Sequence, residues 1–158
     1  MERCLIKDLE ENKTSKISGS IEKVRNTKYM VFIIVRDRSG IIQVSIDKGE
    51  NVELADDAIN ITVGSIVSFV GTMKFSEYVK NGGKEFIPDS LEVLSLAEIY
   101  PFDENANVDT KQDYRWIDLR NEKKSLIFPI QSAFVKYLRE YLYNNDFNEI
   151  HTPKLLGA

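Results

Sequence analysis

The stretch YMVFIIVRDRSGIIQVSI, residues 29–46, decides the fold. Two runs rich in β-branched and apolar residues flank the sequence RDRSG, whose composition is typical of a turn. Together they predict a β-hairpin whose strands are residues 29–36 and 41–46. Within the second run a single polar amide, Gln43, stands among apolar neighbours. Its place there needs an explanation.

The two faces of this hairpin follow from the alternation of side chains along a strand. A hairpin that closes across Arg36 and Ile41 sets Phe32 opposite Ser45. One face then carries only β-branched residues, and we predict that it forms the core. Its members are Val31, Ile33, Val35, Ile42, Val44 and Ile46. The other face brings Phe32 and Gln43 together as diagonal neighbours.

The sequence around the hairpin predicts three further strands and one helix. The predicted elements are a strand at 16–24, a helix within 49–60, a strand within 62–75 and an interrupted strand within 84–99. Gly71 indicates a bend or bulge, and KNGG at 80–83 is a strong signal for a tight turn. Three strands, a helix and two strands is the order of the OB-fold, a mainly β, five-stranded Greek-key barrel that binds oligonucleotides. An SH3-like barrel is the alternative, but it usually lacks a helix between its third and fourth strands.

The character of the sequence changes after Pro101. Residues 101–124 are polar, acidic and poor in periodicity, as in a hinge or linker. From Ser125 apolar residues recur every three or four positions, which predicts a helix. We therefore divide the chain into a barrel at 1–100, a hinge at 101–124 and the start of another domain at 125–158. This last piece has no second layer to bury its apolar face, so we expect it to belong to a longer protein or to pair with another copy.

Composition and charge narrow the class of protein. The 158 residues are 42% hydrophobic and 29% charged, as in a globular protein, and the net charge is −4. Residues 13–48 nevertheless carry eight basic and three acidic side chains, which allows a basic binding face on an acidic protein. One cysteine excludes an internal disulfide and fits a reducing compartment. No apolar run approaches the roughly 20 residues that span a bilayer, so we expect a cytoplasmic protein without a membrane partner.

Phe32 and Gln43 suggest a base-binding site on the outer face of the barrel. An exposed ring can stack on an unpaired base, and an amide offers a donor and an acceptor to a base edge such as that of uracil. The alternative is that Phe32 only caps the barrel and that Gln43 is a solvated strand residue. The single histidine, His151, has no cysteine or second histidine nearby, so we expect neither a metal site nor a catalytic triad.

Three stretches carry a resemblance that covers the whole chain. DYRWIDLR (113–120) and FNEIHTPKLLGA (147–158) closely resemble aspartyl-tRNA synthetases of the archaeal and eukaryotic cytosolic type, and VRDRSGIIQVSI (35–46) resembles their anticodon-binding barrel. The C-terminal stretch resembles motif 1 of class II synthetases, a helix and a strand that ends at a proline, here Pro153. The resemblance implies a truncated α+β catalytic domain and a homodimer that forms through motif 1.

The resemblance also implies roles for particular residues. Phe32 stacks on the central uridine of the aspartate anticodon, and Gln43 hydrogen-bonds to the same base. Lys28 occupies the place of a family arginine that contacts the anticodon loop; lysine keeps the charge but loses the planar fork. Glu92 falls where relatives have a glutamate near another anticodon base, and its alternative is a polar residue on a half-buried strand. Pro153 belongs to the dimer interface.

The family charges tRNA-Asp with aspartate through an aspartyl-adenylate made from ATP and Mg²⁺. The arginines of its motifs 2 and 3 would follow residue 158, so the resemblance implies no catalytic residue and no cofactor within this chain. Two alternatives stay open. One is a free-standing OB-fold module that binds tRNA or other single strands, and the other is part of a lysyl- or asparaginyl-tRNA synthetase.

Overall fold

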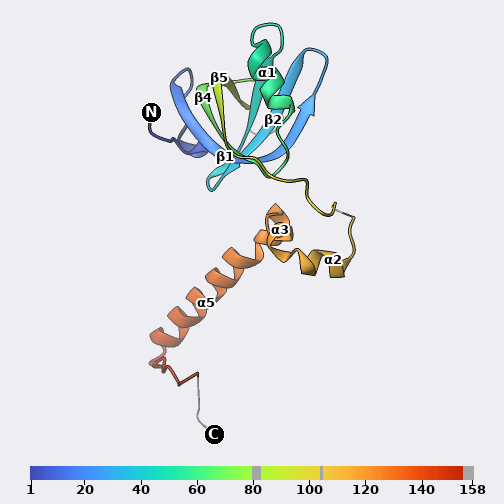
Figure 1. Cartoon of the computed structure of the whole chain (residues 1–158). Helices are drawn as coiled ribbons and strands as arrows, with labels where there is room; N and C mark the ends of the chain where they lie inside the picture. Colours follow the sequence, from blue (N-terminus) through green and yellow to red (C-terminus); the bar gives the residue numbers. More distant parts are fainter. Residues whose placement is uncertain (80–82, 104, 155–158) are drawn as a thin grey trace. The chain divides into compact units, whose positions relative to one another are not determined.

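The computed structural model describes residues 1–79, 83–103 and 105–154 (Figure 1). The chain divides into two compact units, Met1–Tyr100 and Pro101–Ala158. Each unit is described by itself.

The first unit is a closed β-barrel. Its strands are β1 (Thr14–Asn26), β2 (Met30–Asp37), β3 (Gly40–Asp47), β4 (Ile66–Phe75) and β5 (Lys84–Ser95). They follow one another around the barrel in the order β1-β2-β3-β5-β4, and only the β3–β5 pair is parallel. Helix α1 (Val52–Ile59) lies between β3 and β4 in the sequence and buries Ala55 and Ala58 in the barrel core. The predicted OB-fold order is confirmed.

The hairpin of β2 and β3 has the predicted register. Arg36 pairs with Ile41, and Phe32 pairs with Ser45. All six side chains of the β-branched face are at most 2% exposed. Burial of these side chains supplies the main driving force for closing the barrel.

Gly71 allows β4 and β5 to come into close contact. A Cβ atom at this position would lie 2.1 Å from the carbonyl oxygen of Ile87. The register between the two strands shifts between Val70 and Gly71, which confirms the predicted bulge. The predicted turn at 80–83 lies outside the described residues except for Gly83, whose φ is +67° and whose carbonyl accepts a hydrogen bond from the Ser76 N–H at 2.8 Å.

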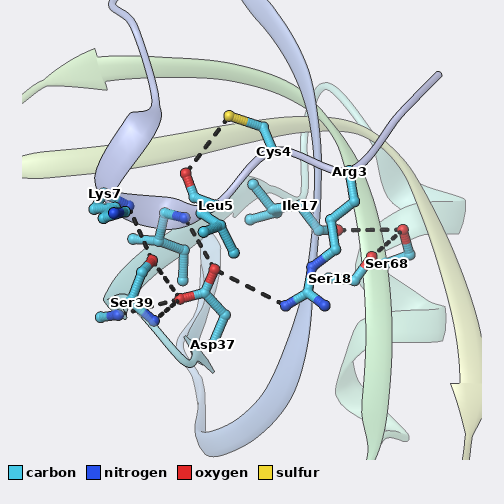
Figure 2. A network of polar contacts seen from close by, with 11 residues as sticks. Arg3, Cys4, Leu5, Lys7, Ile17, Ser18, Asp37, Ser39 and Ser68 are labelled. Carbon is cyan, nitrogen blue, oxygen red and sulfur yellow. Dashed lines mark hydrogen bonds and ion pairs between the residues drawn. The ribbon is translucent and has the colours of Figure 1, made fainter.

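The turn between β2 and β3 is tied to the N-terminal segment through Asp37 (Figure 2). One carboxylate oxygen of Asp37 accepts hydrogen bonds from the Ser39 N–H (2.7 Å), the Ser39 hydroxyl (2.6 Å) and the Gly40 N–H (3.1 Å). The other accepts from the Ile6 N–H at 3.0 Å, within the short 3₁₀ helix η1 (Ile6–Asp8). Burial raises the pKa of Asp37, but these hydrogen bonds outweigh it and hold the pKa below its ordinary value of 3.8.

The second unit contains four helices among its described residues: α2 (Val108–Asp113), α3 (Arg115–Asp118), α4 (Glu122–Ser125) and α5 (Ile127–Asn144). The stretch 101–124, expected to lack periodic structure, therefore carries three short helices. Two of them begin at asparagine caps. Asn107 accepts a hydrogen bond from the Thr110 N–H at 2.8 Å, and Asn121 accepts from the N–H groups of Lys123 and Lys124.

Helix α5 presents the expected apolar stripe, and the stripe is not covered. Its side chains are between 44% and 66% exposed, and they are Ile127, Ile130, Phe134, Tyr137, Leu138 and Tyr141. None of the described helices is long and apolar enough to cross a membrane.

The segment after α5 differs from the prediction, because residues 145–154 form no strand. A strand needs a partner for its backbone groups, and the described part of this unit contains no other strand. Glu149 instead folds back on α5. It accepts hydrogen bonds from Arg139 at 2.8 Å and from the Tyr143 hydroxyl at 3.0 Å, and both lower its pKa. His151 and Pro153 are exposed.

Candidate nucleic-acid interface

The outer face of the β2–β3 hairpin brings Phe32 and Gln43 together, as the parity of the strands predicts. Phe32 pairs with Ser45, and Gln43 pairs with Ile34, so the ring and the amide are diagonal neighbours. Both side chains are half-buried. A ring held in this way can offer one face to a ligand, and the adjacent amide can offer a donor and an acceptor.

Gln43 is connected to strand β5 through two hydrogen bonds. Its Nε2 donates to the Ser45 hydroxyl oxygen at 3.3 Å, and that hydroxyl donates to a carboxylate oxygen of Glu85. Glu85 is the direct partner of Gln43 in the parallel β3–β5 ladder. Neither Ser45 nor Glu85 was predicted to take part in the site. Parity places Ser45 on this face, but the neighbourhood of Glu85 arises only when the barrel closes.

Strand β1 adds two basic side chains to the same outer face. Arg25 pairs with Phe32, and Lys23 pairs with Ile34. Both basic side chains are exposed. In the sequence they stand out only as part of a basic region. Their place on this face could not be predicted, because a bulge in β1 between Ile21 and Lys23 sets which positions face outward. Cations beside a stacking ring suit the phosphates that accompany an unpaired base.

Lys28 lies in the loop between β1 and β2 and is exposed. Its Nζ is 5.1 Å from the centroid of the Tyr29 ring, which is 68% exposed. The backbone of this loop is held by Lys48, whose Nζ donates to the Asn26 side chain at 2.5 Å and to the Thr27 carbonyl at 2.7 Å. Lys28 therefore presents a charge on a flexible side chain from a fixed loop.

Glu92 is not brought to the Gln43 neighbourhood. It is an exposed residue that pairs with Ser68 on β4, and its carboxylate lies 3.4 Å from the Nζ of Lys16. It lies seven positions after Glu85 on β5, roughly 20 Å along the strand. Any ligand that reaches both Gln43 and Glu92 must therefore extend over several nucleotides.

Within the described ranges, no three His, Cys, Asp or Glu side chains gather in a way that could hold a metal ion. The one histidine, His151, lies in the second unit.

A closed five-stranded barrel with this strand order defines the OB-fold class of nucleic-acid-binding domains, and its outer face carries the ring, the amide and the basic side chains. Comparison with family models agrees. Residues 15–94 match the OB-fold nucleic acid binding domain, and residues 107–158 match the class II tRNA synthetases of the D, K and N group. The chain belongs to the family of OB-fold nucleic acid binding domains, and its residues 107–158 are similar to the class II tRNA synthetases.

Curated relatives match almost the whole chain. The aspartate–tRNA(Asp) ligase of Picrophilus torridus is 38% identical, and the match covers 99% of this chain and 38% of the relative. The aspartate–tRNA(Asp/Asn) ligase of Methanocorpusculum labreanum is 36% identical, with 91% of this chain and 35% of the relative covered. The chain thus spans little more than a third of the length of these relatives.

Solved structures show the same fold. The aspartyl-tRNA synthetase of Entamoeba histolytica aligns with a TM-score of 0.83 and 27% identity over 99% of this chain and 40% of that chain. The asparaginyl-tRNA synthetase of Pyrococcus horikoshii aligns with a TM-score of 0.86 and 26% identity over 98% of this chain and 38% of that chain.

Proposed function

We propose that the chain is the anticodon-reading portion of an aspartate–tRNA ligase, and that the outer face of β2 and β3 holds the central uridine of the aspartate anticodon. The observation that carries the proposal is the position of the Phe32 ring beside the Gln43 amide, on a barrel whose curated relatives are named aspartate–tRNA ligases. The ring would stack on the base, and the amide would bind its edge.

The other binding residues have proposed places along the anticodon loop. Lys28 contacts a backbone phosphate or a neighbouring base from the β1–β2 loop. Glu92 meets a different anticodon base, since it lies far along β5 from the Gln43 site. Arg25 joins this set because it pairs with Phe32 on the outer face.

The whole protein is proposed to charge tRNA-Asp with aspartate through an aspartyl-adenylate, in the cytoplasm, with ATP and Mg²⁺ as cofactors. No residue of this chain is assigned to ATP, to Mg²⁺ or to the chemical steps. Residues 101–124 would connect the barrel to the catalytic domain, which begins at 125–158. The stripe of α5 and the segment with Pro153 would form part of a homodimer interface, which the exposure of the stripe supports.

Binding to an anticodon stem-loop tests the proposal. Phe32→Ala should weaken the binding of a stem-loop with the aspartate anticodon by about 1–3 kcal/mol, because a stacking partner is lost. Ile41→Ala is the matched control, a half-buried apolar residue on the same face, and it should leave affinity nearly unchanged. Equal affinities for the wild type and both variants would refute base stacking at Phe32.

The amino acid needs a separate test, because the anticodons for aspartate, asparagine and lysine all have uridine in the middle position. A site that recognises only this base therefore accepts the tRNAs of all three amino acids. In the longer protein proposed to contain this chain, aspartate should drive ATP–pyrophosphate exchange, and asparagine and lysine should not. Exchange driven by asparagine would assign the protein to the asparaginyl group, one of whose members shares its fold.

A further inference from the structure

We propose that Glu85 acts through Ser45 to fix which end of the Gln43 amide faces the ligand, which makes Glu85 a positioning residue for base selection. The inference rests on the proposed function. Its basis is the pair of hydrogen bonds that runs from Gln43 Nε2 to the Ser45 hydroxyl and from that hydroxyl to the Glu85 carboxylate.

The direction of these hydrogen bonds follows from the chemistry of the three groups. A carboxylate can only accept, so the single hydroxyl proton of Ser45 is directed to Glu85. The Ser45 oxygen then has only lone pairs to offer to Gln43. The amide NH₂ of Gln43, and not its carbonyl oxygen, must therefore face Ser45. The carbonyl oxygen is left available for a ligand.

Burial and strand pairing hold this arrangement before any ligand arrives. Ser45 is 1% exposed, so water has little access to its hydroxyl. Glu85 is half-buried, and the parallel ladder places its backbone directly beside that of Gln43. An orientation fixed in advance needs no rearrangement on binding, which favours both affinity and selectivity.

The fixed amide matches uracil and opposes cytosine. Uracil presents an N3–H donor beside a carbonyl oxygen, and these groups pair with the Gln43 carbonyl and with its remaining N–H. Cytosine presents a bare N3 acceptor beside an NH₂ group, which requires the reversed amide. The acidic side chain at position 85 therefore selects uridine, although it does not itself touch the base.

The test compares the affinities of the chain for two anticodon stem-loops that differ only in a central uridine or cytidine. Wild type should prefer uridine by about five- to 150-fold. Glu85→Gln presents either an acceptor or a donor to Ser45, so both amide orientations become available. The preference should fall about fivefold or more, and cytidine binding should tighten. Ser45→Ala, which removes the intermediate hydroxyl, should also lower the preference.

Asp89→Asn is the matched control. It removes the same charge from an exposed position on β5, four residues from Glu85. It should raise affinity for both stem-loops alike and leave their ratio unchanged, since a charge effect does not depend on the base. A merely structural or charge effect of Glu85 would change the affinities for both stem-loops by the same factor and would leave their ratio unchanged.

The outcomes separate this inference from the proposed function. If the wild type prefers uridine, Gln43→Ala abolishes the preference, and Glu85→Gln and Ser45→Ala retain it, the role of Glu85 is overturned while base reading by Gln43 stands. If the wild type binds both stem-loops equally, the proposed function fails, and the inference fails with it.

Discussion

Apolar side chains have opposite environments in the two units. In the barrel, the six β-branched residues of the hairpin core are at most 2% exposed, whereas the six stripe residues of α5 are 44–66% exposed. A barrel closes on itself, so its own strands pair every edge and cover the core. A single amphipathic helix must find another surface. The barrel therefore buries its own apolar face, whereas the apolar stripe of α5 is exposed.

Matched phenylalanine truncations should expose this difference most strongly. Phe86 is fully buried in the barrel, whereas Phe134 on α5 is 66% exposed. Phe86→Ala should destabilise the barrel by about 3–5 kcal/mol, because it removes buried apolar surface and leaves a cavity. Phe134→Ala should change the stability of the barrel by less than about 0.5 kcal/mol. Amide hydrogen exchange of the β3 backbone measures both, and comparable losses would contradict the separation of the two units.

A smaller effect is expected at the turn that ties the barrel to its N-terminal segment. Asp37→Asn should cost about 1.5–3 kcal/mol at neutral pH, because four hydrogen bonds to a charged group lose their acceptor charge. The Asp37 side chain is only 1% exposed, so solvent screens these bonds little.

The pH dependence at Asp37 has a defined sign. The pKa of this carboxyl is lower in the folded state than its ordinary value of 3.8. Its contribution is therefore fully present above pH 3.8 and is lost as the pH falls through the lower folded-state value. Urea denaturation between pH 7 and pH 2 should show this loss in the wild type. An amide at this position does not titrate, so Asp37→Asn should flatten this part of the profile, and an unchanged profile would contradict the assignment.

The smallest effect concerns association through the stripe of α5. If this stripe forms a homodimer interface, Phe134→Lys should weaken self-association by about tenfold or more, because a charge replaces a buried ring. Gln131→Lys places the same residue at another exposed position of α5 and should have little effect. Sedimentation equilibrium distinguishes the variants. A wild-type chain that remains monomeric at high concentration would leave α5 to pack against another part of a longer protein.

The fold was predictable where the pattern is local. Alternation along β2 and β3 gave the register, the buried face and the Phe32–Gln43 pair, and Gly71 marked the bulge. The polar run at 101–124 was predicted to be a linker, but it carries three short helices. Its asparagine caps are visible in the sequence, but short helices without an apolar stripe give no periodic signal.

The rest of the candidate site depends on long-range contacts. Glu85 lies 42 positions after Gln43 in the numbering, and only the parallel β3–β5 pairing brings the two residues together. Such a pair cannot be derived from alternation within either strand. The prediction of a strand after α5 was wrong for a related reason. A strand depends on a partner strand, and the described residues of that unit contain no such partner.

The central claim is that Gln43 reads the central uridine, and a double-mutant cycle tests it most directly. The cycle combines Gln43→Ala with the change of the central uridine to cytidine in an aspartate anticodon stem-loop, at one fixed salt concentration. Each single change should cost about 1–3 kcal/mol, and the two together should cost little more than one, because both remove the same contact. If all four combinations bind alike and weaken together as salt rises, the barrel face is an electrostatic platform and Gln43 reads no base.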